Sequence, residues 1–150
     1  MITLERYVLQ RLGPGSGPRM ALNMFSRAFT ATSLRAFWQY WNPGYGFLLC
    51  RYCYRPLRRF LPHSVSLLLT FAACGFFLHD VLYLIPMAIQ GAEMPLPFVS
   101  CWFLFLGAFI LLFEFLGINF SRLGAAQRVV IHAGMLGATC GLTVLFSAQV

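Results

Sequence analysis

The chain has 150 residues, of which 59% are hydrophobic and 10% are charged, and its mean hydropathy is +0.73. A soluble domain carries about 25% charged residues, so this composition excludes an ordinary soluble protein and indicates one unit embedded in a membrane. The net charge of +7 arises from eleven Arg without Lys. Aromatic residues and long apolar runs accompany these Arg, which favours lipid head groups and not nucleic acid as the partner.

The N-terminal residues 1–32 are predicted to form a cytoplasmic tail and linker that precedes a membrane domain over residues 33–150. No apolar core of the length that a signal peptide needs is found here. The Gly-Pro-Gly-Ser-Gly-Pro run over residues 13–18 is typical of a flexible or turn-rich connection.

An amphipathic interfacial helix is predicted next. Leu34, Phe37, Trp38 and Trp41 recur at a spacing that puts them on one helical face, and Ser33 can cap the start. An Asn-Pro-Gly sequence at 42–44 should end this helix, because Pro disfavours helical backbone in the preceding residue. Residues 45–54 are apolar and aromatic but too short to span, so we expect a re-entrant or interfacial segment there.

Three segments are long and apolar enough to cross a bilayer, at about residues 64–89, 97–118 and 129–147. Nine of the eleven Arg precede the first span and the other two lie between the second and third. The positive-inside rule therefore places the N-terminus and the 119–128 link in the cytoplasm. The fold class that follows is an all-α integral membrane protein.

Two ionisable residues inside the first span, His79 and Asp80, are candidates for function, because such side chains are costly at membrane depth. A neutral imidazole in an apolar tunnel can accept a hydroxyl proton, and the equally weighted alternative is a structural hydrogen bond to a neighbouring helix. For Asp80, an interhelical hydrogen bond or a protonated carboxyl is favoured over pairing with an Arg. Consecutive helical residues lie about 100° apart, so these two side chains should not share one face.

Other ionisable residues have simpler interpretations. Glu114 is expected to reach from the second span to the inner interface, and His63 and His132 are expected to be interfacial. The Arg cluster at residues 51–59, which includes Arg58, suits a phosphate or pyrophosphate, although topology and anionic lipid explain it better. The five Cys do not form a disulfide pattern, and the single Cys-x-x-Cys at 50–53 has no second pair, so we expect no metal site.

Small residues recur at four-residue spacing along the third span, at Ala133, Gly137 and Gly141. Such spacing allows helices to approach closely and predicts a packing face against another helix.

Residues 34–80 resemble the core of the membrane-bound O-acyltransferase family, often shortened to MBOAT. In that family a Phe-Trp-x-x-Trp sequence is followed by His or Asn, then by a Tyr-x-Pro-Leu element, and then by a helix that carries the characteristic His. This chain has the first element at residues 37–41 with Asn42 after it, the second at 54–57, and the third at 75–79 with His79 as the family's His. Order and spacing agree together. Asn42 is closer to the sterol and diacylglycerol branch, whereas Asp80 stands where the bacterial branch commonly has Gly.

The resemblance implies an enzyme that transfers an acyl group from a thioester donor, acyl-CoA or an acyl-carrier protein, to a hydroxyl acceptor. It implies catalytic roles for His79 and Asn42, and we assign substrate binding to Trp38, Trp41, Tyr54, Asp80 and Arg58. The implied reaction needs no metal and no permanently bound cofactor. We expect a bacterial inner membrane as the location.

Members of the family have further spans N-terminal to these motifs. The resemblance therefore leaves a truncated copy, half of a split enzyme with a multi-span membrane partner, and a homo-oligomer as alternatives. The competing class is a non-catalytic membrane scaffold or assembly subunit derived from such an enzyme. A small solute carrier is weaker, because the chain has no internal repeat.

Overall fold

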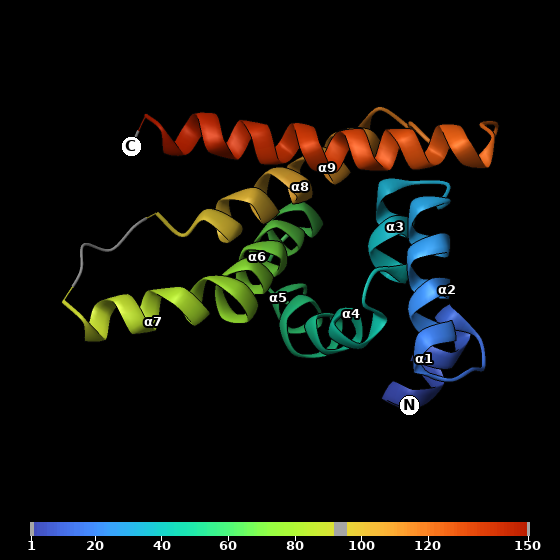
Figure 1. Ribbon diagram of the computed structural model, residues 1–150, viewed down its shortest axis with the longest axis horizontal. Coiled ribbons are helices and arrows are strands. Elements are labelled where there is room, and N and C mark those ends of the chain that lie inside the picture. Colours follow the sequence, from blue (N-terminus) through green and yellow to red (C-terminus); the bar gives the residue numbers. More distant parts are fainter. Residues whose placement is uncertain (1, 92–95, 150) are drawn as a thin grey trace.

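The structure, a computed structural model, describes residues 2–91 and 96–149, and within these ranges every regular element is helical. Three helical stretches are long and apolar enough to cross a membrane: His63–Ile89, Phe98–Phe115 and Ala125–Ser147. The predicted all-α fold with three spans is thus confirmed, and it is consistent with an integral membrane protein (Figure 1).

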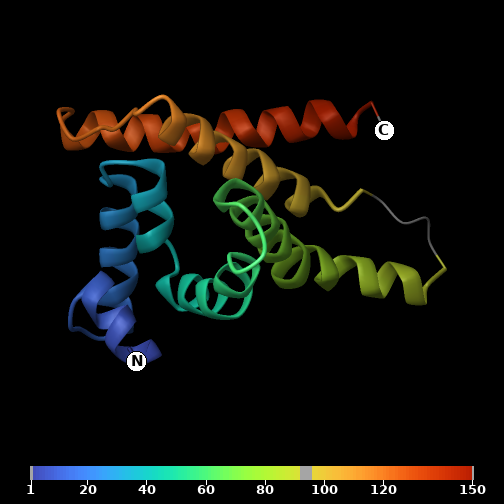
Figure 2. The ribbon, with the colours of Figure 1, turned by 180° about the vertical axis from the view of Figure 1, so that it is seen from behind.

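The N-terminal region contains helices α1 (Leu4–Leu12) and α2 (Gly17–Phe29), where the sequence predicted a tail and linker. The difference has a local cause: Pro18 stands in the first turn of α2, a position where the missing N–H costs nothing. Gly13 ends α1 at a positive φ of 79°. Figures 1 and 2 show α2 beside α3, both steeply inclined to the direction of α9.

Helix α3 (Leu34–Tyr40) is the predicted amphipathic helix. The Ser33 hydroxyl accepts a hydrogen bond of 3.1 Å from the Ala36 N–H, which confirms the expected cap. Phe37 is buried and stacks on Trp41, with ring centroids 5.6 Å apart. The apolar face of α3 therefore packs against protein and fixes the two Trp side chains of the motif.

A nearly continuous helical segment follows, formed by α4 (Pro43–Leu49), the π-helical turn η1 (Cys50–Tyr54) and α5 (Arg55–Leu57). It covers the residues predicted as re-entrant or interfacial. The segment packs against α1 at one end and against α6 at the other. Because the segment is helical, its backbone hydrogen-bonding groups are paired within it.

The first span combines α6 (His63–Gly75), the π-helical turn η2 (Phe76–Asp80) and α7 (Val81–Ile89). It packs closely on the second span, α8 (Phe98–Phe115). A Cβ added at Gly75 would stand 2.6 Å from the Ser100 Cα, so only glycine allows this approach. Gly75 therefore makes room for the partner helix.

The core joins α3, α6, α8 and the α8–α9 link through a buried cluster of Leu34, Leu67, Ile110 and Phe120. The link is tied to the N-terminal helices by the Arg128 guanidinium, which donates to the carbonyl oxygens of Thr30 and Phe120, both about 3 Å away. These contacts hold the third span, α9 (Ala125–Ser147), across α2 and α8.

The small-residue face of α9 is open. Ala133, Gly137 and Gly141 are exposed, and apart from the local backbone of α9 no atom of the described residues lies within 4 Å of where a Cβ would stand on either glycine. The packing of this face against another helix remains a prediction.

Candidate functional site

A cavity of about 490 Å³ lies between α3, α4, η1, α6, η2 and α8. Five of the seven residues predicted for the site line it, although they are distributed over residues 38–79: Trp38, Trp41, Asn42, Tyr54 and His79. The fold thus brings both proposed catalytic side chains to one space.

Helix α6 and turn η2 form one wall of this cavity. Their lining residues form a single stripe at helical spacing: His63, Leu67, Thr70, Phe71, Cys74, Leu78 and His79. At the rise of an α-helix, the stripe is about 24 Å long from its first to its last residue. The cavity is therefore elongated along the first span.

His79 presents an exposed imidazole at one end of this stripe. Its ring lies against Phe103, with centroids 5.6 Å apart. Within residues 2–91 and 96–149 the imidazole makes no hydrogen bond, so both ring nitrogens can interact with a ligand. An apolar neighbour and free nitrogens suit the proton transfer considered for this residue.

Asp80 points away from the cavity and is fully buried. Its carboxylate accepts hydrogen bonds from the backbone N–H groups of Val99 at 2.9 Å and Ser100 at 2.7 Å, and from the Ser100 hydroxyl. The Tyr83 hydroxyl donates a further bond of 3.0 Å. Asp80 therefore caps the start of α8, which is the interhelical hydrogen bonding favoured from the sequence.

Asn42 is the N-cap of α4, and its side-chain oxygen lies 3.5 Å from the Tyr45 N–H that donates to it. With φ of 44° and ψ of 66°, it is the non-glycine residue with positive φ in the described part of the chain. Asn tolerates this left-handed conformation better than most residues. Backbone strain of this kind is concentrated at functional sites, and here it directs a polar residue to the cavity.

Arg58 is not part of the cavity wall, and its guanidinium donates to the Leu61 carbonyl in the turn between α5 and α6. Three other Arg line the cavity instead: Arg11, Arg35 and Arg55. No Asp or Glu belongs to the lining within the described residues. The electrostatic character of the cavity is therefore positive.

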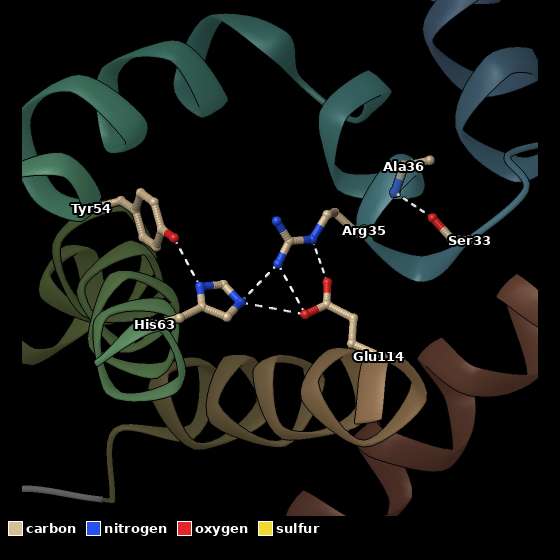
Figure 3. A network of polar contacts seen from close by, with 6 residues as sticks. All are labelled: Ser33, Arg35, Ala36, Tyr54, His63 and Glu114. Carbon is tan, nitrogen blue, oxygen red and sulfur yellow. Dashed lines mark hydrogen bonds and ion pairs between the residues drawn. The ribbon is translucent and has the colours of Figure 1, made fainter. Parts of the chain in front are cut away.

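A polar network that the sequence did not predict lies where η1, α6, α3 and α8 meet (Figure 3). The Arg35 guanidinium pairs with the Glu114 carboxylate and contacts the His63 ring, which in turn contacts the Tyr54 hydroxyl. Glu114 is thus bound to a cation and does not simply extend to the interface. Its place as the acidic residue of an apolar span was the available signal that an Arg partner was needed.

His132 also differs from expectation. It was predicted to be interfacial but is 1% exposed, and its Nε2 lies 3.0 Å from the Ala31 carbonyl oxygen. Its ring packs between Phe37 and Phe120. The residue therefore joins α9 to the N-terminal helices and lies outside the main cavity.

Comparison with known proteins adds no relative: no family model, no curated protein and no solved structure matches the chain. The interpretation of the cavity therefore depends on its own residues. In the described part of the chain, no three His, Cys, Asp or Glu side chains are arranged to hold a metal ion.

Proposed function

We propose that this protein is a membrane-bound O-acyltransferase that moves an acyl group from a thioester donor to a hydroxyl acceptor. The observation that carries the proposal is the convergence of His79, Asn42, Trp38, Trp41 and Tyr54 on one elongated cavity. These are the residues through which the chain resembles the MBOAT family.

In the proposed reaction, an unprotonated nitrogen of His79 takes the proton of the acceptor hydroxyl. The resulting oxygen nucleophile attacks the thioester carbonyl, a C–O bond forms, and the C–S bond breaks. The departing thiolate takes the proton back from the imidazolium. The Asn42 amide polarises the carbonyl, and its N–H groups favour the charge that develops on the carbonyl oxygen.

We place the N-terminal helices at the cytoplasmic face of a bacterial inner membrane, because nine Arg precede the first span. A soluble thioester donor, acyl-CoA or an acyl-carrier protein, then meets the Arg-lined end of the cavity first. His79 lies about 24 Å further along the span, within reach of the acyl carbonyl rather than of the donor's charged portion.

The test is acyl transfer by the full chain in membranes, measured as thiol release and as acylated product. His79→Ala should lower the rate by about a hundredfold or more, the usual contribution of a general base. Phe77→Ala is the matched control, because Phe77 lies in the same turn but is 69% exposed on the outer surface. If His79→Ala transfers acyl groups at the parental rate, the proposed role is wrong.

The second candidate is a non-catalytic scaffold or assembly subunit, and the open glycine face of α9 favours it. Purification in mild detergent with associated chains separates the possibilities. A multi-span membrane protein bound to this chain supports a split enzyme, and a second copy supports a homo-oligomer. A stable partner together with undetectable transfer by the complex supports the scaffold.

A further inference from the structure

The hydrogen-bond directions in the Arg35 network follow from its geometry (Figure 3). The Arg35 Nη2 lies 2.9 Å from Glu114 Oε2 and 2.8 Å from His63 Nε2. A guanidinium has donors only, so His63 Nε2 must accept and carries no proton. Nε2 and Oε2 are 3.3 Å apart, longer than a usual N–H···O bond of about 2.9 Å, as expected for two acceptors that share one donor group.

The position of the proton on His63 then determines the role of Tyr54. A neutral imidazole without a proton on Nε2 carries it on Nδ1, and this atom lies 2.8 Å from the Tyr54 hydroxyl oxygen. The ring N–H therefore donates to Tyr54, whose own O–H is left to donate elsewhere. Within the described residues this hydroxyl has no other partner, and Tyr54 lines the cavity.

The charge of the lining indicates which ligand oxygen this O–H meets. Arg11, Arg35 and Arg55 line the cavity, and the carboxylate that compensates one of them, Glu114, lies outside the lining. A ligand that accepts a hydrogen bond and carries negative charge is complementary to the Tyr54 O–H and the Arg side chains of the lining. The long apolar stripe of α6 suits an acyl chain attached to that group.

We propose that Tyr54 is a ligand-binding donor that holds a carboxylate or phosphate oxygen at the head of an acyl-chain amphiphile. Glu114, Arg35 and His63 are positioning residues that set the direction of its O–H. The inference uses the cavity of the proposed function but does not depend on acyl transfer.

The proton position is measured directly by ¹⁵N NMR of the full chain in detergent with ¹⁵N-labelled His. The chain has three His, and the signals lost in His63→Asn assign His63. We expect a protonated Nδ1 and a bare Nε2. A proton on Nε2 in the unliganded protein would overturn the proposed direction of the network.

Ligand binding is measured by quenching of Trp fluorescence with 9,10-dibromostearate, because Trp38 and Trp41 line the cavity. Tyr54→Phe should weaken binding about tenfold or more, the effect of losing a hydrogen bond to a charged group. A dibrominated probe with the same hydrocarbon chain but a phosphate head distinguishes carboxylate from phosphate ligands, since the tighter-binding probe identifies the natural head group. The same chain with a trimethylammonium head has no acceptor oxygen and should bind both proteins equally.

Two substitutions of His63 separate positioning from simple packing. The amide of Asn can place an N–H near the position of Nδ1–H, so His63→Asn should keep most of the affinity for dibromostearate. His63→Leu removes the ring N–H that orients the Tyr54 hydroxyl, so this variant should bind dibromostearate as weakly as Tyr54→Phe. Equal binding by all variants would overturn the proposal, as would an equal loss for the trimethylammonium probe.

The result of the ligand-binding experiments is separate from the result of the acyl-transfer assay. The binding proposal is tested by the dibromostearate affinities of Tyr54→Phe and the two His63 variants, whereas the proposed reaction is tested by the acyl transfer of His79→Ala. Loss of transfer in His79→Ala together with weaker binding by Tyr54→Phe supports both proposals. Intact transfer in His79→Ala refutes only the first.

Discussion

Asp80 and Glu114 are the carboxylates of the described spanning helices, and the protein accommodates them in different ways. Asp80 is fully buried and is surrounded by neutral donors at the start of α8. Glu114 stands one residue before the end of the same helix, where a third of its side chain is exposed and its partner is the Arg35 cation.

The two ends of α8 explain this difference. The first N–H groups of a helix lack partners within it and the helix dipole is positive there, so a carboxylate is favoured without a cation. At the C-terminal end the dipole is negative, and a carboxylate needs a positive partner. Asp80 therefore has a structural role at the start of α8, whereas Glu114 is part of a hydrogen-bond network that reaches the cavity. The following substitutions test this distinction.

Asp80→Ala should have the largest effect. It removes the acceptor of two backbone N–H groups and of the Ser100 hydroxyl in a buried region, at about 1–3 kcal/mol for each group left unpaired. We expect a loss of about 3 kcal/mol or more in unfolding free energy, measured by thermal or denaturant unfolding in detergent. Asp80→Asn keeps one acceptor oxygen and should be intermediate. Parental stability in Asp80→Ala would contradict the capping role.

Gly75→Ala should come second, because it disturbs the same helix contact sterically. The added Cβ would stand 2.6 Å from the Ser100 Cα, and overpacking of this kind costs about 1–3 kcal/mol. Gly137→Ala is the matched control, because apart from the local backbone of α9 no described atom lies within 4 Å of its Cβ position. The control should be neutral or slightly stabilising, since Ala favours helix by about 0.5–1 kcal/mol. Equal melting temperatures for the two variants would refute the close contact.

Glu114→Gln should have the smallest effect on stability. The side chains of Arg35 and Glu114 are 45% and 34% exposed, and exposed ion pairs contribute about 1 kcal/mol or less. A double-mutant cycle with Arg35→Gln measures the coupling between the two side chains. A coupling larger than the effect of Asp80→Ala would reverse the comparison of the two ends of α8.

The sequence predicted the spans well because membrane thickness imposes their length and apolarity. The third spanning helix, α9, begins at Ala125, four residues before the predicted start of the span, because helical hydrogen bonding continues past the apolar run. Gln127 supports this extra turn by accepting from the Gly124 N–H. The N-terminal helices were missed because Gly and Pro were interpreted as breakers, although Pro18 begins α2.

Motif and spacing carried information on which residues line the cavity. The motif residues do meet in one cavity, and His79 and Asp80 do face different ways. The Arg35 network could not be predicted, because Glu114 is 79 positions from Arg35 and 51 positions from His63 in the sequence. Their pairing depends on how the helices pack. Periodicity describes the face of a single helix and does not identify its neighbour.

The π-helical turn η2 has a consequence for natural variation in this protein. It separates the α6 stripe that lines the cavity from the residue that caps α8. A π-helical turn holds one residue more than an α-helical turn, so loss of that residue would leave a regular α-helix with both flanking faces in place, whereas one further residue would rotate everything after it by about 100° relative to α6. Orthologues should therefore show substitutions or a one-residue gap between residues 76 and 80, and an inserted residue at this turn would mark a lineage that has lost one of the two contacts.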